Sequence, residues 1–137
     1  MLKEIQFQRH KQRMYMLDMD YQEMGDYECR DDFWPGYNSK GQERASLPNG
    51  TYHGITAEVT HGKYGPAYGN FYITTGDERG RDIHGGGSNS PEPYADYQGW
   101  YKTLGCLRMQ NKEGVEMSEE IIASVNAGID VVLTVVN

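Results

Sequence analysis

The sequence is poor in cysteine and has no long apolar run. Two cysteines in 137 residues are too few for a disulfide framework. No apolar run approaches the roughly 20 residues that a membrane-spanning helix needs, so we expect no membrane span. The N-terminal stretch also lacks the continuous apolar core of a secretory signal. With no visible export signal, a cytoplasmic protein, a chain whose leader has been removed and a phage product released by lysis all remain compatible, and the localisation stays unknown.

The chain also lacks positive charge. Thirteen Lys and Arg residues against twenty Asp and Glu residues give a formal net charge of −7, and the basic residues are spread along the sequence. A clustered basic surface is what attracts phosphate groups, so the sequence predicts no nucleic-acid partner. The length suits one folded unit, and we expect a single domain over residues 1–137.

What the sequence does contain favours a mainly β fold. Seventeen glycines and eleven tyrosines occur, while long stretches with helical apolar periodicity are missing. The expected strands are residues 3–9, 13–19, 50–59, 67–75 and 129–136. The last of these is apolar and rich in β-branched residues, which predicts a strand buried on both faces. Residues 30–48 and 85–99 are expected to be irregular loops.

One short helix is expected before the last strand. Ser118 is a suitable cap for its first turn, and Glu119 and Glu120 suit the positive end of the helix dipole. Ile121, Ile122 and Val125 provide an apolar face, and Gly128 is placed to end the helix.

Candidate chemistry lies between residues 83 and 109. Cys29 stands between acidic residues, which oppose thiolate formation. Cys106 follows Gly105 and precedes Arg108, whose charge would favour a thiolate if it lies nearby. Cys106 together with His84 could be a nucleophile and its base, and the alternative is a buried, inert cysteine. The other three histidines have polar surroundings and no partner at metal-ligand spacing.

Two further patterns in this region have simpler explanations, and a third stays open. The run Gly85 to Gly87 lacks the residues of a phosphate-binding loop, so a flexible turn is expected. The irregular spacing of Asp82, Glu92 and Asp96 gives little support to a metal site with His84, and no metal is expected. The aromatic residues of the same stretch either line a groove or pack the loop onto the protein body, and both interpretations stay open: Tyr94, Tyr97, Trp100 and Tyr101.

The run IHGGG followed by TLGCLRMQN resembles the active-site signature of the YkuD-type L,D-transpeptidase catalytic domain. In that family an I-H-G segment precedes an [S/T]-x-G-C-[IVL]-R segment. LPNGTYHG resembles the entry to a family strand, and EGVEMSEEIIASVNAGIDVVLTVV resembles its closing helix, glycine turn and final strand. The likeness covers residues 47–136. It implies an L,D-transpeptidase-like β-sandwich with one short helix before the last strand.

The resemblance also implies residue roles. Cys106 aligns with the nucleophile, His84 with its general base, and Gly85 with the position that orients the imidazole. Backbone N–H groups around Gly105 and Cys106 would form the oxyanion hole. Arg108 aligns with the motif arginine, which would support the cysteine loop and steer a substrate carboxylate.

The implied substrate is the stem peptide of peptidoglycan, which the cysteine would cleave and then transfer or hydrolyse without a cofactor. Trp100 and Tyr101 would contribute to substrate binding, within a loop, residues 88–101, that would act as a lid. Leu104 stands where many members have a second histidine. The family implies a periplasmic or cell-envelope location. Two alternatives remain, a non-catalytic peptidoglycan-binding module and a phage- or toxin-type stem-peptide peptidase, and the sequence gives no oligomeric state.

Overall fold

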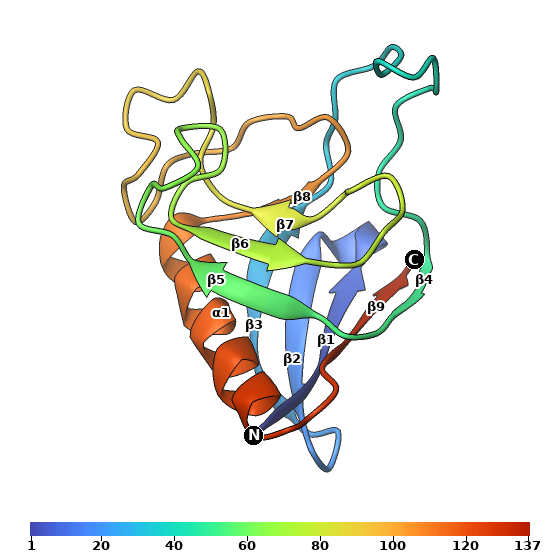
Figure 1. Ribbon diagram of the computed structural model, residues 1–137, viewed down its shortest axis with the longest axis vertical. Coiled ribbons are helices and arrows are strands. Elements are labelled where there is room, and N and C mark those ends of the chain that lie inside the picture. Colours follow the sequence, from blue (N-terminus) through green and yellow to red (C-terminus); the bar gives the residue numbers. More distant parts are fainter.

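The computed structural model describes all residues, 1–137, and is built mainly from strands. One α-helix precedes the last strand, as predicted (Figure 1). A three-residue 3₁₀ turn, Arg9–Lys11, joins the first two strands. The elements in chain order are β1 (Leu2–Gln8), β2 (Arg13–Asp18), β3 (Glu23–Arg30), β4 (Gly50–Tyr52), β5 (Thr56–Val59), β6 (Phe71–Thr74), β7 (Ile83–His84), β8 (Leu107–Met109), α1 (Asn111–Asn126) and β9 (Val132–Val136).

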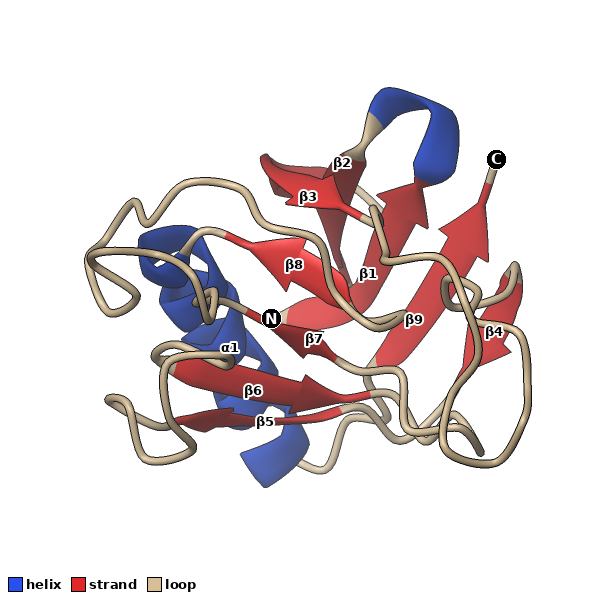
Figure 2. Cartoon of the chain, turned by 90° about the horizontal axis from the view of Figure 1, so that it is seen from above, coloured by secondary structure: helices blue, strands red, loops and turns tan.

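The nine strands form one curled sheet in the order β4-β9-β1-β2-β3-β8-β7-β6-β5. The curl brings β5 to β8 opposite β1, β2 and β9, so that two layers face each other (Figure 2). Most neighbours are antiparallel, but β1 pairs with β9 and β7 pairs with β8 in parallel. This mainly β architecture, with one helix before the last strand, is the one that the sequence predicted.

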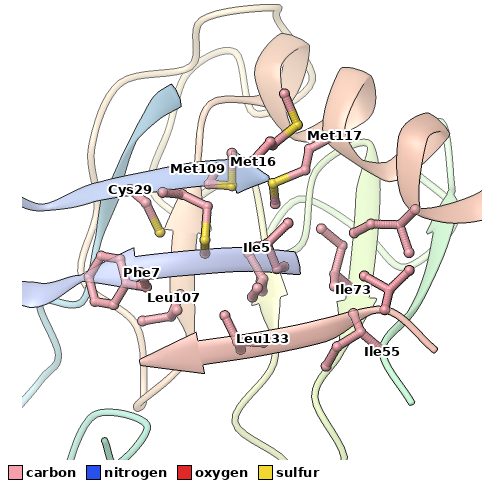
Figure 3. Close-up of a cluster of buried hydrophobic side chains, with 14 of the residues drawn as sticks. Ile5, Phe7, Met16, Cys29, Ile55, Ile73, Leu107, Met109, Met117 and Leu133 are labelled. Carbon is pink, nitrogen blue, oxygen red and sulfur yellow. The ribbon is translucent and has the colours of Figure 1, made fainter. Parts of the chain in front are cut away.

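The hydrophobic core fills the space between the layers. Ile5, Phe7 and Leu133 come from one layer and Ile73 and Leu107 from the other, and all belong to one buried cluster (Figure 3). The helix α1 packs against β1, β5 and β6 and closes one side of this core. It is 16 residues long, and no helix in the structure has both the length and the apolar character needed to cross a membrane.

The predicted strand 50–59 is two strands on opposite edges of the sheet, because the chain turns sharply between them. Gly54 has φ +65° there, a backbone conformation that favours glycine. Asp130 holds the turn, since one carboxylate oxygen accepts the Gly54 N–H at 2.7 Å and the other lies 3.0 Å from His53 Nδ1. Residues 67–70 are likewise not strand; they belong to a turn that precedes β6.

The expected strands also left out β3, β7 and β8, and the expected burial of β9 was wrong. β3 was missed because it is largely polar, and only Cys29 among its residues is buried. β9 was expected to be buried on both faces, but its burial alternates: Leu133 and Val135 enter the core, while Val132 and Thr134 are half-buried on the other face.

The helix begins eight residues earlier than predicted, because its cap position is Gln110 and not Ser118. Ser118 is therefore no cap: it lies inside α1, fully buried, with its hydroxyl unpaired. The first half of the helix was not predicted because it contains Gly114, and glycine is a poor helix former. The structure requires it, since a Cβ at Gly114 would come within 1.9 Å of the Phe71 ring. The predicted end is correct: Gly128 has φ +83° and donates its N–H to Val125 O at 3.0 Å, as a helix-terminating glycine does.

Candidate functional site

His84 and Cys106 are brought together by two neighbouring strands. β7 and β8 run in parallel with His84 opposite Arg108, and Cys106 stands directly before β8. Both side chains line one cavity of about 270 Å³, here called the cysteine cavity. The cysteine is partly exposed, whereas the histidine is 4% exposed and forms part of the floor. The long stretch of chain between them is thus bridged by strand pairing.

The Cys106 sulfur is held by the backbone ahead of β7. Sγ accepts the Asp82 N–H at 3.4 Å and lies 4.0 Å from Gly80 O. Burial raises the pKa of the Cys106 thiol, and the carboxylates of Asp82 and Asp77 raise it further. The Asp82 N–H and the Arg108 charge lower the pKa, but by less. Arg108 therefore acts in the expected direction, yet the thiol form dominates at neutral pH.

The His84 ring is fixed by its own chain. Nδ1 lies 2.9 Å from Gly85 O, and because a carbonyl only accepts, Nδ1 carries the proton and Nε2 is left as the acceptor. Burial lowers the pKa of His84 to about 4, and the nearby Arg108 charge acts in the same direction. The imidazole is thus neutral at physiological pH. Its pKa lies below the near-neutral value expected of an efficient general base.

Two tyrosines that the sequence analysis missed enclose the imidazole. The Tyr68 ring meets the His84 ring edge-on with centroids 5.0 Å apart, and the Tyr72 ring is stacked on it at 6.3 Å. Tyr72 OH donates to the Asp82 carboxylate at 2.6 Å, which links the histidine wall to the residue that holds the sulfur. Thr75 also donates to this carboxylate, through its N–H at 2.9 Å. Asp82 is therefore tied into the protein body.

The three glycines after His84 form a tightly packed contact, and the prediction of a flexible turn was wrong. All three are buried. A Cβ at Gly86 would lie 2.3 Å from Pro66 O, and one at Gly69 would lie 2.5 Å from Gly86 N. These glycines allow the turn at residues 65–69 to press against the histidine loop, which places Tyr68 beside His84.

That turn is fastened by residues of the motif itself. Gly85 N donates to Tyr68 O at 3.1 Å, and Gly87 N donates to Pro66 O at 2.8 Å. Arg108 Nη2 donates to Ala67 O at 3.1 Å. The rest of the Arg108 guanidinium binds Tyr101 O at 2.7 Å, while its Nε is buried without a partner. Arg108 thus supports two loops around the cysteine, and its side chain is 4% exposed.

The backbone around the cysteine offers one free donor. Gly105 N donates to Thr103 Oγ1 at 3.0 Å, so this predicted oxyanion donor is already engaged. Thr103 Oγ1 in turn donates to Cys106 O at 2.7 Å. The Cys106 N–H has no acceptor within the chain. Gly105 has φ +132°, and a Cβ at this position would lie only 2.7 Å from Ala45 O, which explains glycine at this place in the sequence.

The two predicted aromatic contacts lie away from the sulfur. Trp100 faces a separate cavity with Glu28 and Glu113, and Arg30 stacks over its ring at 4.5 Å. The Tyr101 ring packs against Gly87, and neither aromatic side chain lines the cysteine cavity. Their proposed part in substrate binding stays a prediction.

The expected lid, residues 88–101, is docked onto the start of α1. Asn111 Nδ2 donates to Pro93 O at 2.8 Å and to Ala95 O at 2.7 Å. The Gln98 side chain accepts the Asn111 N–H at 2.9 Å. Of this loop, only Ser88 reaches the cysteine cavity. The segment caps the helix and does not cover the site.

The loop at residues 31–46 contributes to the site, and no sequence motif indicated this. It rises from the same end of the molecule as the loop before β8 (Figure 1). Trp34 N donates to Thr103 O at 2.9 Å, which fastens the two loops together. Trp34 and Lys102 line one wall of the cysteine cavity, and Leu104, 65% exposed, stands at its mouth.

Two larger clefts adjoin the cysteine cavity, and Tyr68 lines all three. The polar cleft, about 600 Å³, reaches Cys106 and Leu104 and is lined by polar residues that include Asn38, Lys40, Glu78 and Arg79. The tyrosine cleft, about 630 Å³, is lined by Thr56, Ala57, Glu58, Tyr64, Tyr68, Tyr72 and Thr74. Cys106 therefore lines both the cysteine cavity and the polar cleft, whereas His84 lines the cysteine cavity alone.

Comparisons with known proteins identify a similar fold but no related sequence. No family model matches the sequence, and no curated protein matches it. The structure is similar to the crystal structure of an L,D-transpeptidase from Xylanimonas cellulosilytica, with a TM-score of 0.55 and 17% sequence identity. The match covers 97% of this chain and 59% of that one. This chain thus spans little more than half the length of its structural neighbour and shares the L,D-transpeptidase-like fold with it.

Proposed function

We propose that the protein is a cysteine-dependent enzyme that cleaves peptidoglycan stem peptides and passes the acyl group to an amine or to water. The observation that carries this proposal is the shared cavity of Cys106 and His84, with the imidazole oriented and a free backbone N–H at the sulfur. The fold of the structural neighbour supports the substrate class.

The electrostatics favour a neutral resting pair. The thiol pKa lies above its ordinary 9.0 and the imidazole pKa is about 4. Moving the proton from sulfur to nitrogen in the free enzyme is unfavourable, because the thiol holds the proton more tightly than the imidazole does. The thiol and imidazole therefore stay neutral until substrate arrives.

Proton transfer then accompanies attack. The Cys106 sulfur bonds to the carbonyl carbon between the diamino acid and the terminal D-alanine while His84 Nε2 takes the thiol proton. The oxyanion accepts a hydrogen bond that the free Cys106 N–H donates. When the tetrahedral intermediate collapses, the C–N bond breaks and His84 returns the proton to the departing amine of D-alanine. The thioester that remains is attacked by a second stem amine, which forms a cross-link, or by water.

Purified disaccharide tetrapeptide tests the proposal directly. We expect loss of one alanine, by mass spectrometry of the products, and an acyl-enzyme adduct on Cys106 in the intact protein. A dimeric product identifies transfer, and a tripeptide without dimer identifies hydrolysis. If the wild-type protein yields neither product nor adduct, the proposal is wrong.

A non-catalytic binding module is the second candidate. The raised pKa of the Cys106 thiol and the lowered pKa of His84 both disfavour a reactive ion pair, which is the observation on its side. Binding of tetrapeptide with equal affinity by wild-type and Cys106→Ala protein, without turnover by either, would establish that candidate.

A further inference from the structure

The tyrosine cleft lies over the edge of the sheet formed by β5 and β6, beside the cysteine cavity. Cys106 does not line it, so the proposed chemistry leaves it unexplained. Its volume, about 630 Å³, is in the range of cavities that hold small molecules. Tyr68 forms the wall between this cleft and the cysteine cavity.

Aromatic rings dominate the surface of the cleft. Tyr64 is 45% exposed and Tyr68 is 37% exposed, although both are large side chains. Each packs against the half-buried Tyr72, with ring centroids 5.9 and 5.8 Å apart. The Tyr68 hydroxyl has no hydrogen-bond partner in the chain. Exposed, mutually supported rings present flat faces whose negative charge attracts C–H groups of a ligand.

Hydrogen-bonding groups stand around these rings. The Glu58 carboxylate accepts Tyr64 OH at 2.7 Å and remains partly exposed. The hydroxyls of Thr56 and Thr74 also belong to residues that line the cleft, and they are hydrogen-bonded to each other. The nearest cation, Lys63, is paired with Glu58 at 3.0 Å. The cleft therefore offers hydroxyls and an acceptor but no unpaired positive charge.

The polar cleft differs in charge. Lys40 and Arg79 line it and neither forms an ion pair, against a single unpaired carboxylate, Glu78. An anionic ligand such as a peptide carboxylate is thus better matched to the polar cleft. The tyrosine cleft suits a neutral molecule with C–H faces and a rim of hydroxyls.

We propose that the tyrosine cleft binds a sugar ring, a neutral N-acetylhexosamine of a glycan strand, stacked on Tyr64 and Tyr68. A pyranose has an apolar face of C–H groups for the rings and equatorial hydroxyls for Glu58 and Thr56. That this glycan is the one that carries the stem peptide rests on the proposed function, whereas the saccharide chemistry of the cleft does not.

The test uses a β-1,4-linked N-acetylglucosamine tetramer without any stem peptide, titrated into Cys106→Ala protein and followed by NMR and calorimetry. We expect saturable binding with shifts at residues of β5, β6 and the 65–69 turn. Tyr64→Ala and Tyr68→Ala each weaken binding about tenfold, because each removes one stacking face. Tyr64→Phe and Tyr68→Phe keep the face and lose less than about threefold. Tyr97→Ala, which removes a still more exposed tyrosine ring at a different cavity, leaves the affinity unchanged.

The phenylalanine variants and the NMR spectra separate loss of a ring from loss of the fold. Absence of saturable binding at millimolar tetramer, or equal weakening by Tyr97→Ala, overturns the inference. So does displacement of the sugar by a simple amine such as lysine amide, since that assigns the cleft to a cation. Failure of the proposed function is a separate result: sugar binding then persists while wild-type protein leaves stem tetrapeptides intact.

Discussion

Cys29 lies in β3 and Cys106 stands directly before the neighbouring strand β8, with which β3 pairs through Cys29 with Met109 and Arg30 with Arg108. Burial raises the pKa of both thiols, and acidic neighbours raise both further. Cys29 is sealed in the core, whereas Cys106 opens onto a cavity with His84 on its floor. The difference between them is access and a neighbouring base, because neither thiol is poised as a thiolate.

The largest expected effect is the difference in enzyme activity between the Cys106→Ala and Cys29→Ala variants. Cys106→Ala removes the nucleophile and should lower turnover of disaccharide tetrapeptide by at least about a thousandfold. Cys29→Ala should keep activity within about twofold and instead cost about 1 kcal/mol of unfolding free energy, since it leaves a small void in the core. Mass spectrometry of products and urea unfolding measure the two effects. Equal losses of activity in the two variants would contradict the assignment of Cys106 as the nucleophile.

Alkylation of the native protein tests whether solvent access explains the difference in reactivity between the two thiols. Cys106 should react with iodoacetamide at least about a hundredfold faster than Cys29, which becomes available only when the protein opens. The Cys106 rate should rise with pH to a midpoint above the ordinary value of 9.0, because burial raises its pKa. His84→Gln should leave the rate at pH 7 nearly unchanged, since the resting pair is neutral. A strong decrease in that variant would mean that His84 holds a thiolate before substrate binds.

His84 should make the folded protein sensitive to acid, in a way that neither cysteine does. Its pKa is lowered from 6.5 to about 4 by burial, so between these pH values the unfolded chain binds the extra proton. The stabilisation is present above pH 6.5 and is lost as the pH falls toward 4, by roughly 3 kcal/mol. Urea unfolding from pH 4 to pH 7 measures it. His84→Gln should flatten the dependence by that amount, and an unchanged slope would place the histidine in water.

Part of this site was predictable from the sequence because the residues within each of its two motifs are close along the chain. His84 with its glycines and Cys106 with Arg108 form two short motifs, and parallel pairing of β7 with β8 places them together. The end of α1 was predictable too, since Gly128 acts within one turn of the helix.

The rest depends on contacts between distant segments. Gly114 argues against helix until the Phe71 ring that it accommodates is seen. Tyr68 becomes part of the site only because Gly69 and Gly86 allow the two backbones to touch. The position of Trp34 depends on pairing of residue 33 with Thr103. No periodicity or spacing records such partners, so the walls of the cavity could not be predicted.

The smallest expected effect comes from the carboxylate beside Cys106, which has its counterpart in Asp31 beside Cys29. Asp82→Asn removes a charge that raises the Cys106 pKa, so the thiolate fraction at pH 8 should grow and alkylation should accelerate about two- to fivefold. Tyr72→Phe removes the hydroxyl that donates to this carboxylate and keeps the charge, so it should give no acceleration. Asp26→Asn, on the surface, serves as the charge control. If Tyr72→Phe accelerates the reaction as much as Asp82→Asn does, the hydrogen-bond network and not the charge sets the reactivity of the sulfur. The charge of a neighbouring carboxylate would then not be a property that Cys106 shares with Cys29.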